Sequence, residues 1–119
     1  MRYLSLLIGS QPGTPPPPEL FEAIMTLGQE ATASGALLDM GGLVQGSTTR
    51  LSVADAELAV VDGPFTETKE LISYAVYEVH SKAEAVEWTR RFMAVHRDLW
   101  PAWAGDSYVV PIMGGAPDR

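Results

Sequence analysis

The chain has 119 residues, of which 46% are hydrophobic and 19% charged, a balance that predicts one small folded domain and excludes a disordered chain. Its formal net charge of −7 would repel phosphate backbones, so we expect no nucleic-acid partner. The chain has no cysteine, and two histidines are too few for a multi-histidine site, so we expect no metal and no other cofactor.

The pattern of apolar residues shows no export or membrane signal. The apolar run at residues 3–8 is shorter than the core of a secretory signal peptide. No apolar stretch approaches the roughly 20 residues that a bilayer-spanning helix needs. We therefore expect a cytoplasmic protein without a membrane partner, whose first strand covers residues 3–8.

A loop and a helix follow this strand. Residues 9–18 contain five prolines, which predict a rigid loop or, alternatively, a ligand for a proline-recognition domain. Residues 19–34 are expected to form a helix. Its apolar residues recur at helical spacing at Leu20, Ile24, Leu27 and Ala31. Gly28 lies beside this stripe and indicates a close approach to a strand or a partner.

The middle of the chain predicts three strands. The strand at residues 36–44 contains the pair Gly41-Gly42, which indicates a bulge or a place where another group approaches the backbone. Residues 48–53 and 57–61 are expected to pair as a hairpin. Residues 62–65, Asp-Gly-Pro-Phe, then form a turn.

The last third predicts a strand, a helix and a final strand. Residues 71–79 are rich in aromatic and β-branched residues, which favour a strand. The helix begins at Ser81, which forms a capping box with Glu84. Its apolar seam is Ala85, Trp88, Phe92, Val95 and Leu99. A strand at 108–113 ends the single domain, residues 1–113, and residues 114–119 are expected to be a flexible tail.

This order of elements predicts an α+β fold of ferredoxin-like type, βαββαβ with an extra central hairpin. Two helices would cover one face of a mostly antiparallel sheet. The other face would be left bare, and a second copy of the chain is the simplest cover for it. We therefore expect a homodimer in which two sheets pack face to face.

Residues 61–70, Val-Asp-Gly-Pro-Phe-Thr-Glu-Thr-Lys-Glu, resemble the signature of the DGPF-domain proteins within the YCII-related family. The first strand and residues 85–101 are also similar to that family's layout. The resemblance covers nearly the whole chain and implies a dimeric α+β barrel. It implies no single activity, although some YCII-related relatives have been proposed as enzymes that act on small organic molecules through a histidine–aspartate pair.

The chain departs from the family pattern at three places. Ser73 and Tyr74 stand where the family usually has a glycine pair, and residues 108–111 replace a Glu-x-Arg-Pro pattern by Tyr-Val-Val-Pro. The first helix holds no histidine, so the pair of the relatives is not carried over. We therefore expect a site that is more apolar than is usual for the family.

The turn after the hairpin offers candidate catalytic residues. Asp62 is either a turn residue whose carboxylate accepts backbone N–H bonds or an acid/base group at the mouth of a pocket. Lys69 is expected to pair with Glu67 or Asp62, which would pin the loop or position a substrate carbonyl. In the catalytic interpretation Asp62 and Lys69 act on the substrate, and Glu67 helps to bind it.

Three more residues are candidates for proton transfer. Asp39 interrupts an apolar strand, so it is exposed on one face of the sheet or, on the other, buried with a raised pKa. His80 precedes the second helix, and His96 lies near its end, where the helix dipole favours the charged ring. We read both histidines first as solvated, with a through-space pair to Asp39 or Asp62 as the catalytic alternative.

Aromatic residues suggest a pocket beside the sheet. Tyr74, Tyr77, Tyr108 and Phe65 are expected to line it, because a phenol combines an apolar ring with one polar group. The first hypothesis is a homodimer that binds a small organic molecule there. If it is an enzyme, we expect it to catalyse isomerisation, cyclisation or elimination of that molecule with a carboxylate as the base and without a cofactor. The alternative is a structural or regulatory dimer without catalysis, in which side chains fill that space.

Overall fold

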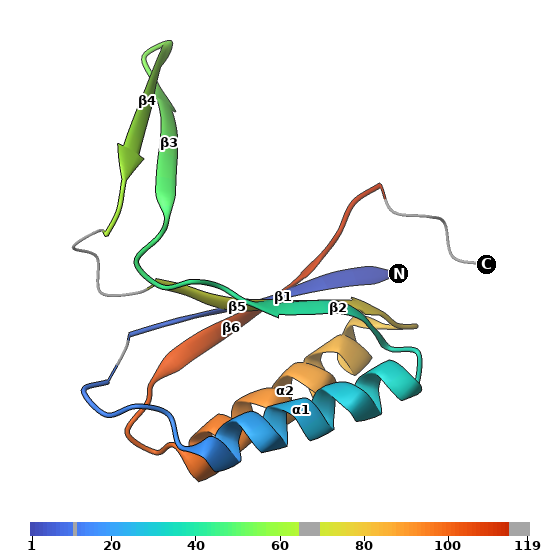
Figure 1. Ribbon diagram of the computed structural model, residues 1–119. Helices are drawn as coiled ribbons and strands as arrows, with labels where there is room; N and C mark the ends of the chain where they lie inside the picture. The colour runs from blue at the N-terminus through green and yellow to red at the C-terminus, as the bar shows by residue number, and fades with distance from the viewer. Residues whose placement is uncertain (11, 65–69, 115–119) are drawn as a thin grey trace.

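The computed structural model describes residues 1–10, 12–64 and 70–114 (Figure 1). Within these ranges the chain forms β1 (Arg2–Gly9), α1 (Pro18–Ala33), β2 (Leu37–Gly42), β3 (Thr49–Ala54), β4 (Glu57–Asp62), β5 (Glu70–Glu78), α2 (Lys82–Leu99) and β6 (Gly105–Pro111). Four strands form an antiparallel sheet in the order β2-β5-β1-β6, and β3 and β4 form a separate hairpin. Both helices lie on one face of the sheet. This α+β arrangement is compatible with the expected ferredoxin-like type.

The predicted elements are confirmed, with their ends shifted by a few residues. Helix α1 starts at Pro18, where a missing backbone N–H costs nothing because the first turn has no acceptor for it. Helix α2 is capped by the Ser81 hydroxyl, which accepts from the backbone N–H of Glu84 at 3.3 Å. The strand expected at 36–44 ends at Gly42, and the last strand begins at Gly105. The tail expected at 114–119 lies outside the described residues from position 115 onward.

Strand β1 is the centre of the fold. Its side chains alternate between buried and half-buried along the strand, so Tyr3, Ser5 and Leu7 face the helices. The core around them is Tyr3, Ala31, Ala36, Leu37, Tyr77, Val79 and Ala85. One face of the sheet is therefore packed against the two helices, and the opposite face, here called the open face, is not covered by the described residues.

The buried seam of α2 differs from the predicted one. The predicted seam contained Trp88, Val95 and Leu99, whereas the fully buried residues of this helix are Ala85, Thr89 and His96. Thr89 tolerates burial because its hydroxyl donates to the Ala85 carbonyl at 2.9 Å and is hydrogen-bonded to the Ser5 hydroxyl at 3.1 Å. Because the hydroxyl of Thr89 is hydrogen-bonded, this face of the helix can pack against the sheet.

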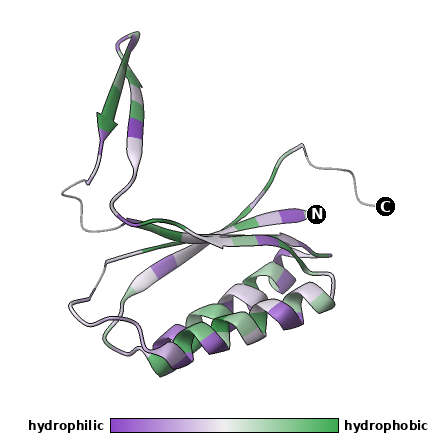
Figure 2. Ribbon diagram, viewed as in Figure 1, coloured by the Kyte–Doolittle hydropathy of each residue, from purple (hydrophilic) through white to green (hydrophobic). Residues whose placement is uncertain are grey.

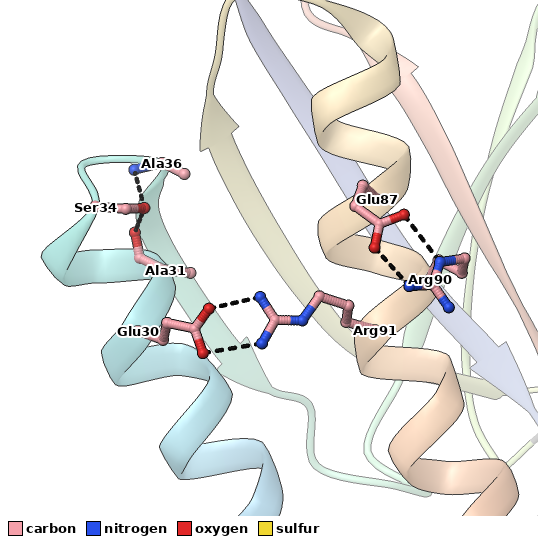
Figure 3. A network of polar contacts seen from close by, with 7 residues as sticks. All are labelled: Glu30, Ala31, Ser34, Ala36, Glu87, Arg90 and Arg91. Atoms are coloured by element: carbon pink, nitrogen blue, oxygen red, sulfur yellow. Dashed lines mark hydrogen bonds and ion pairs between the residues drawn. The ribbon is translucent and has the colours of Figure 1, made fainter.

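The two helices are joined at their exposed sides by a bidentate ion pair (Figure 3). The guanidinium of Arg91 donates to both carboxylate oxygens of Glu30, at 2.6 and 2.9 Å. These hydrogen bonds lower the pKa of the Glu30 carboxyl. Arg91 also lies 4.9 Å from the ring centre of Trp88, a cation–π contact.

Of the glycines singled out in the sequence, Gly28 and Gly41 are sites of close approach, whereas a side-chain carbon on Gly42 would meet nothing within 4 Å. A side-chain carbon on Gly28 would lie 3.1 Å from the sulfur of Met40, so α1 comes close to β2 there. On Gly41 it would lie 2.8 Å from ring carbon Cε1 of Tyr74. The absence of a side chain at Gly41 therefore lets the Tyr74 ring lean over β2.

The β3–β4 hairpin projects away from the four-stranded sheet. Its turn, Asp55-Ala56, has positive φ angles of 53° and 63°, the backbone of a type I′ turn that matches strand twist. The register places four exposed aliphatic residues on one face: Leu51, Val53, Leu58 and Val60. Figure 2 shows that hydrophobic residues continue into this projecting element.

Candidate functional site

A cavity of about 490 Å³ lies between α1 and the sheet. Helix α1 contributes its whole apolar stripe, together with Gly28 beside it: Leu20, Ile24, Leu27, Gly28 and Ala31. The sheet contributes Ser5, Leu7, Ser73, Ala75 and Tyr77. Many of these side chains are small, and small residues at facing positions of two layers leave space between them. The volume is in the range of pockets that hold small organic molecules.

The second helix closes the cavity with a buried histidine. His96 is 5% exposed, and its Nδ1–H donates to the Phe92 carbonyl at 2.8 Å. Its ring packs against Phe92 and Trp103, with ring centres 4.7 and 4.8 Å away. Burial lowers the pKa of His96, and the bond to Phe92 opposes this only in part. The ring is therefore neutral at pH 7, with Nε2 as its acceptor atom.

Two other polar side chains in the wall keep an atom without a partner. The indole nitrogen Nε1 of Trp100 is buried and has no hydrogen-bond acceptor among the described residues. Gln45 donates from Nε2 to the Leu71 carbonyl at 3.1 Å, which leaves its buried Oε1 without a donor among the same residues. Buried polar atoms are nearly always satisfied, so these two atoms are exceptions in the packing of the wall.

The wall is apolar and uncharged. Of the described residues that line the cavity, none carries a formal charge at pH 7. Aromatic residues Phe21, Tyr77, Phe92 and Trp100 form much of it, and burial raises the pKa of the Tyr77 phenol, which stays protonated. A charged ligand would lose its hydration here without gaining an opposite charge, so the cavity favours neutral molecules.

Some of the residues predicted for the site do line this cavity. Tyr77 and His96 belong to its wall. Tyr74 borders it as well, but the register places its side chain on the open face of the sheet, as it does those of Tyr108 and Asp39, which do not line the cavity. Asp39 is exposed and accepts a hydrogen bond from the Tyr74 hydroxyl at 2.9 Å. The alternative of a buried Asp39 is therefore wrong: its position in β2 points it away from the helices.

The remaining predicted residues lie elsewhere. Asp62 ends β4 in the projecting hairpin, where it is exposed and accepts from the Thr49 hydroxyl at 2.7 Å. His80 is exposed just before α2. Phe65, Glu67 and Lys69 lie outside the described residues. Neither Asp39 nor Asp62 hydrogen-bonds His96, whose described partner is the Phe92 carbonyl.

The first reading of His96 as a solvated, charged helix-end residue is wrong. The helix dipole favours the cation there, but the ring turns inward and is desolvated, and desolvation has the larger effect on its pKa. Gln45 was missed, and Trp100, one of the aromatic residues that could line a pocket, was ranked below the three tyrosines. The four-residue spacing of Phe92, His96 and Trp100 could have revealed the inward face, had histidine been counted as a buried aromatic residue.

Acidification tests the burial of His96. Because its folded pKa lies below the unfolded value of about 6.5, the unfolded chain binds the proton more readily, and stability falls as the pH drops below about 6.5. The free energy of unfolding in urea, measured at pH 7.5 and 5.5, should therefore fall less for His96→Phe than for the wild type. His80→Gln, at the exposed histidine, should keep the wild-type dependence. Equal pH dependence in wild type and His96→Phe would contradict the burial.

Comparison with family models and with curated protein sequences gives no match. Within residues 1–10, 12–64 and 70–114 no group of three acidic, histidine or cysteine side chains is placed to hold a metal ion. The helices in this part of the chain are not long and apolar enough to cross a bilayer. The functional argument therefore depends on the cavity itself.

Proposed function

We propose that the protein binds a small, neutral, largely apolar organic molecule in the cavity between α1 and the sheet. The single observation that carries this proposal is a cavity of about 490 Å³ whose described wall is aromatic, aliphatic and uncharged. A side-chain-filled interior, as the structural alternative requires, would leave no such space.

The proposal is for binding rather than for catalysis by a carboxylate. Proton transfer of the kind considered from the sequence needs a desolvated carboxylate next to the ligand. The described residues of the cavity wall include no Asp or Glu. Among these residues His96 is the group whose pKa lies nearest to the physiological range, so any acid/base use of the cavity would pass through His96.

We further propose a homodimer of the DGPF type within the YCII-related family. The resemblance of residues 61–70 to that family supports this assignment. The open face supports the dimer, because its cross-strand rows are apolar: Tyr74, Leu6 and Tyr108 in one row, and Val76, Leu4 and Val110 in the next. A row of this kind facing water is unusual in a monomer, and an identical face on a second copy would cover it.

Binding of a neutral fluorescent probe tests the proposed function. N-Phenyl-1-naphthylamine is uncharged, and its emission increases in apolar surroundings. We expect saturable binding to the wild type with one probe per chain. Leu27→Trp, which places an indole in the cavity, should weaken binding at least tenfold, a loss of about 1.4 kcal/mol.

The matched control is Met25→Trp on the same helix. Met25 is 63% exposed and does not belong to the cavity wall, so this variant should bind the probe like the wild type. Equal weakening in both variants, or no binding by the wild type, would contradict the proposal and favour the structural dimer. Circular dichroism confirms that each variant is folded before binding is measured.

A further inference from the structure

The β3–β4 hairpin has an apolar face that is left uncovered in the part of the chain that the structure describes. Every residue of both strands is exposed, and the two strands form a sheet separate from the four-stranded one. Four aliphatic residues share one face of the hairpin, here called the arm face, and each is at least 62% exposed: Leu51, Val53, Leu58 and Val60. Tyr108, on the open face of the sheet, is 54% exposed. The arm face thus presents more apolar surface per residue to water than the open face does.

The hairpin is anchored at its base but lacks packing along its length. At the base, the Gly63 N–H donates to the Thr48 carbonyl at 2.7 Å. The chain that leads into the hairpin is joined to β5, since the Leu43 N–H donates to the Ile72 carbonyl at 2.8 Å. A two-stranded hairpin by itself is marginally stable in water and needs a helix or further strands against its apolar face. The arm face is therefore expected to have a partner.

The hairpin stands on the same side of the sheet as the open face. Figure 1 shows α1 and α2 on one side of the four-stranded sheet and β3 and β4 rising from the other side. A second copy of the chain that covers the open face must therefore lie beside the hairpin. The hairpin thus borders the interface of the proposed homodimer.

The open face alone is small for a stable interface. Four strands about 4.8 Å apart, with about seven residues each at about 3.3 Å per residue, cover a flat area of about 450 Å² before the relief of the side chains is counted. A standard interface between proteins buries about 800 Å² on each partner. Apolar surface at the border of the open face would narrow this difference, and the hairpin provides such surface.

From these observations we infer that the hairpin is a dimerisation arm, whose arm face packs against the second copy of the chain. This inference rests on the proposed homodimer and adds a second contact to it. Two-fold symmetry gives each copy one arm, so a single dimer covers both arm faces. The arm face carries no charged side chain, so its burial against an apolar surface leaves no charge without a partner.

Two neighbouring substitutions test the arm face. Leu58 and Ala59 are adjacent and exposed in β4, so their side chains lie on opposite faces of the hairpin. Leu58→Asp places a carboxylate on the arm face, where the dimer would bury it without a positive partner. We expect the dissociation constant of the dimer, measured by analytical ultracentrifugation, to rise at least tenfold. Ala59→Asp adds the same charge on the other face, and its dissociation constant should stay within threefold of the wild-type value.

The outcomes separate the arm from the dimer as a whole. A wild-type dimer with equal dissociation constants for Leu58→Asp and Ala59→Asp would overturn the arm and leave the open-face dimer standing. A wild type that stays monomeric at high concentration would overturn the homodimer, and the arm with it.

A measurement on the wild type avoids any effect of a substitution on folding. In a dimer mixed from ¹³C-labelled and unlabelled chains, isotope-filtered spectra record nuclear Overhauser effects between the two copies alone. We expect such effects from methyl groups of the arm face, such as those of Val53 and Leu58, and from Leu4 and Val76 on the open face. Effects from the open face without any from the arm face would overturn the arm. Their absence from both faces would overturn the homodimer as well.

Discussion

Leu20→Ala is expected to lower the free energy of unfolding by about 3 kcal/mol. Leu20 is 2% exposed in the first turns of α1 and lines the cavity beneath that helix. The truncated side chain would enlarge an existing space that the neighbouring residues do not refill, so the cost includes both lost apolar burial and added cavity. Urea denaturation at constant protein concentration measures this change.

Met25→Ala on the same helix is the control for this prediction. Met25 is 63% exposed, so its truncation should change stability by no more than about 0.5 kcal/mol. A cost of less than about 1 kcal/mol for Leu20→Ala would contradict the packing of α1 over the sheet. Such a result would also contradict the position of α1 as one wall of the proposed binding cavity.

Val110→Asp is expected to convert the proposed dimer into a monomer. Val110 lies on the open face of β6 and is 46% exposed in the single chain. In a face-to-face dimer the new carboxylate would be buried opposite an apolar surface without a positive partner, which costs several kcal/mol. We therefore expect the dissociation constant of the dimer to be at least a hundredfold higher than that of the wild type, as measured by analytical ultracentrifugation.

Val86→Asp is the control that separates disruption of the dimer interface from the effect of an added negative charge. Val86 is 44% exposed on α2, away from the open face, and the substitution introduces the same carboxylate. This variant should remain as dimeric as the wild type. A wild type that is monomeric at high concentration, or a Val110→Asp variant that associates like Val86→Asp, would contradict the face-to-face arrangement.

Most of the secondary structure could be predicted from the sequence because the local signals agree with one another. The run of prolines ends where α1 begins, Ser81 caps α2, and the apolar runs of β1 and β5 have the composition of strands. The glycine positions were informative for a similar reason. Gly28 and Gly41 each lie where a side chain of another element comes within about 3 Å, and glycine leaves room for such an approach.

The site was harder to predict because it depends on register and on contacts between distant segments. Asp39 could not be assigned to a face until β2 was paired with β5, since a shift of one residue reverses every side chain. Tyr74, Tyr77 and Tyr108 looked alike in the sequence, yet the register turns Tyr77 toward the helices and Tyr74 and Tyr108 to the open face. Composition alone does not distinguish these cases.

The cavity is formed by residues of three segments that are remote from one another in sequence. It arises because small side chains of β1, β5 and α1, such as Ser5, Ala75 and Gly28, face one another. His96 was misjudged for a related reason. Its position at a helix end suggested solvent, but Trp103, beyond the helix, returns to cover the ring. No local pattern in the sequence records that contact.

A backbone ¹H–¹⁵N titration of the wild type with N-phenyl-1-naphthylamine tests the location of binding most directly. Binding in the cavity predicts shifts that saturate together for amides of both layers, such as Leu27 and Gly28 in α1 and Ser73 and Ala75 in β5. The amides of Leu51 and Val60 in the hairpin should stay unchanged. Shifts confined to the hairpin or to the open face, or no saturable shift at all, would contradict a ligand site between α1 and the sheet.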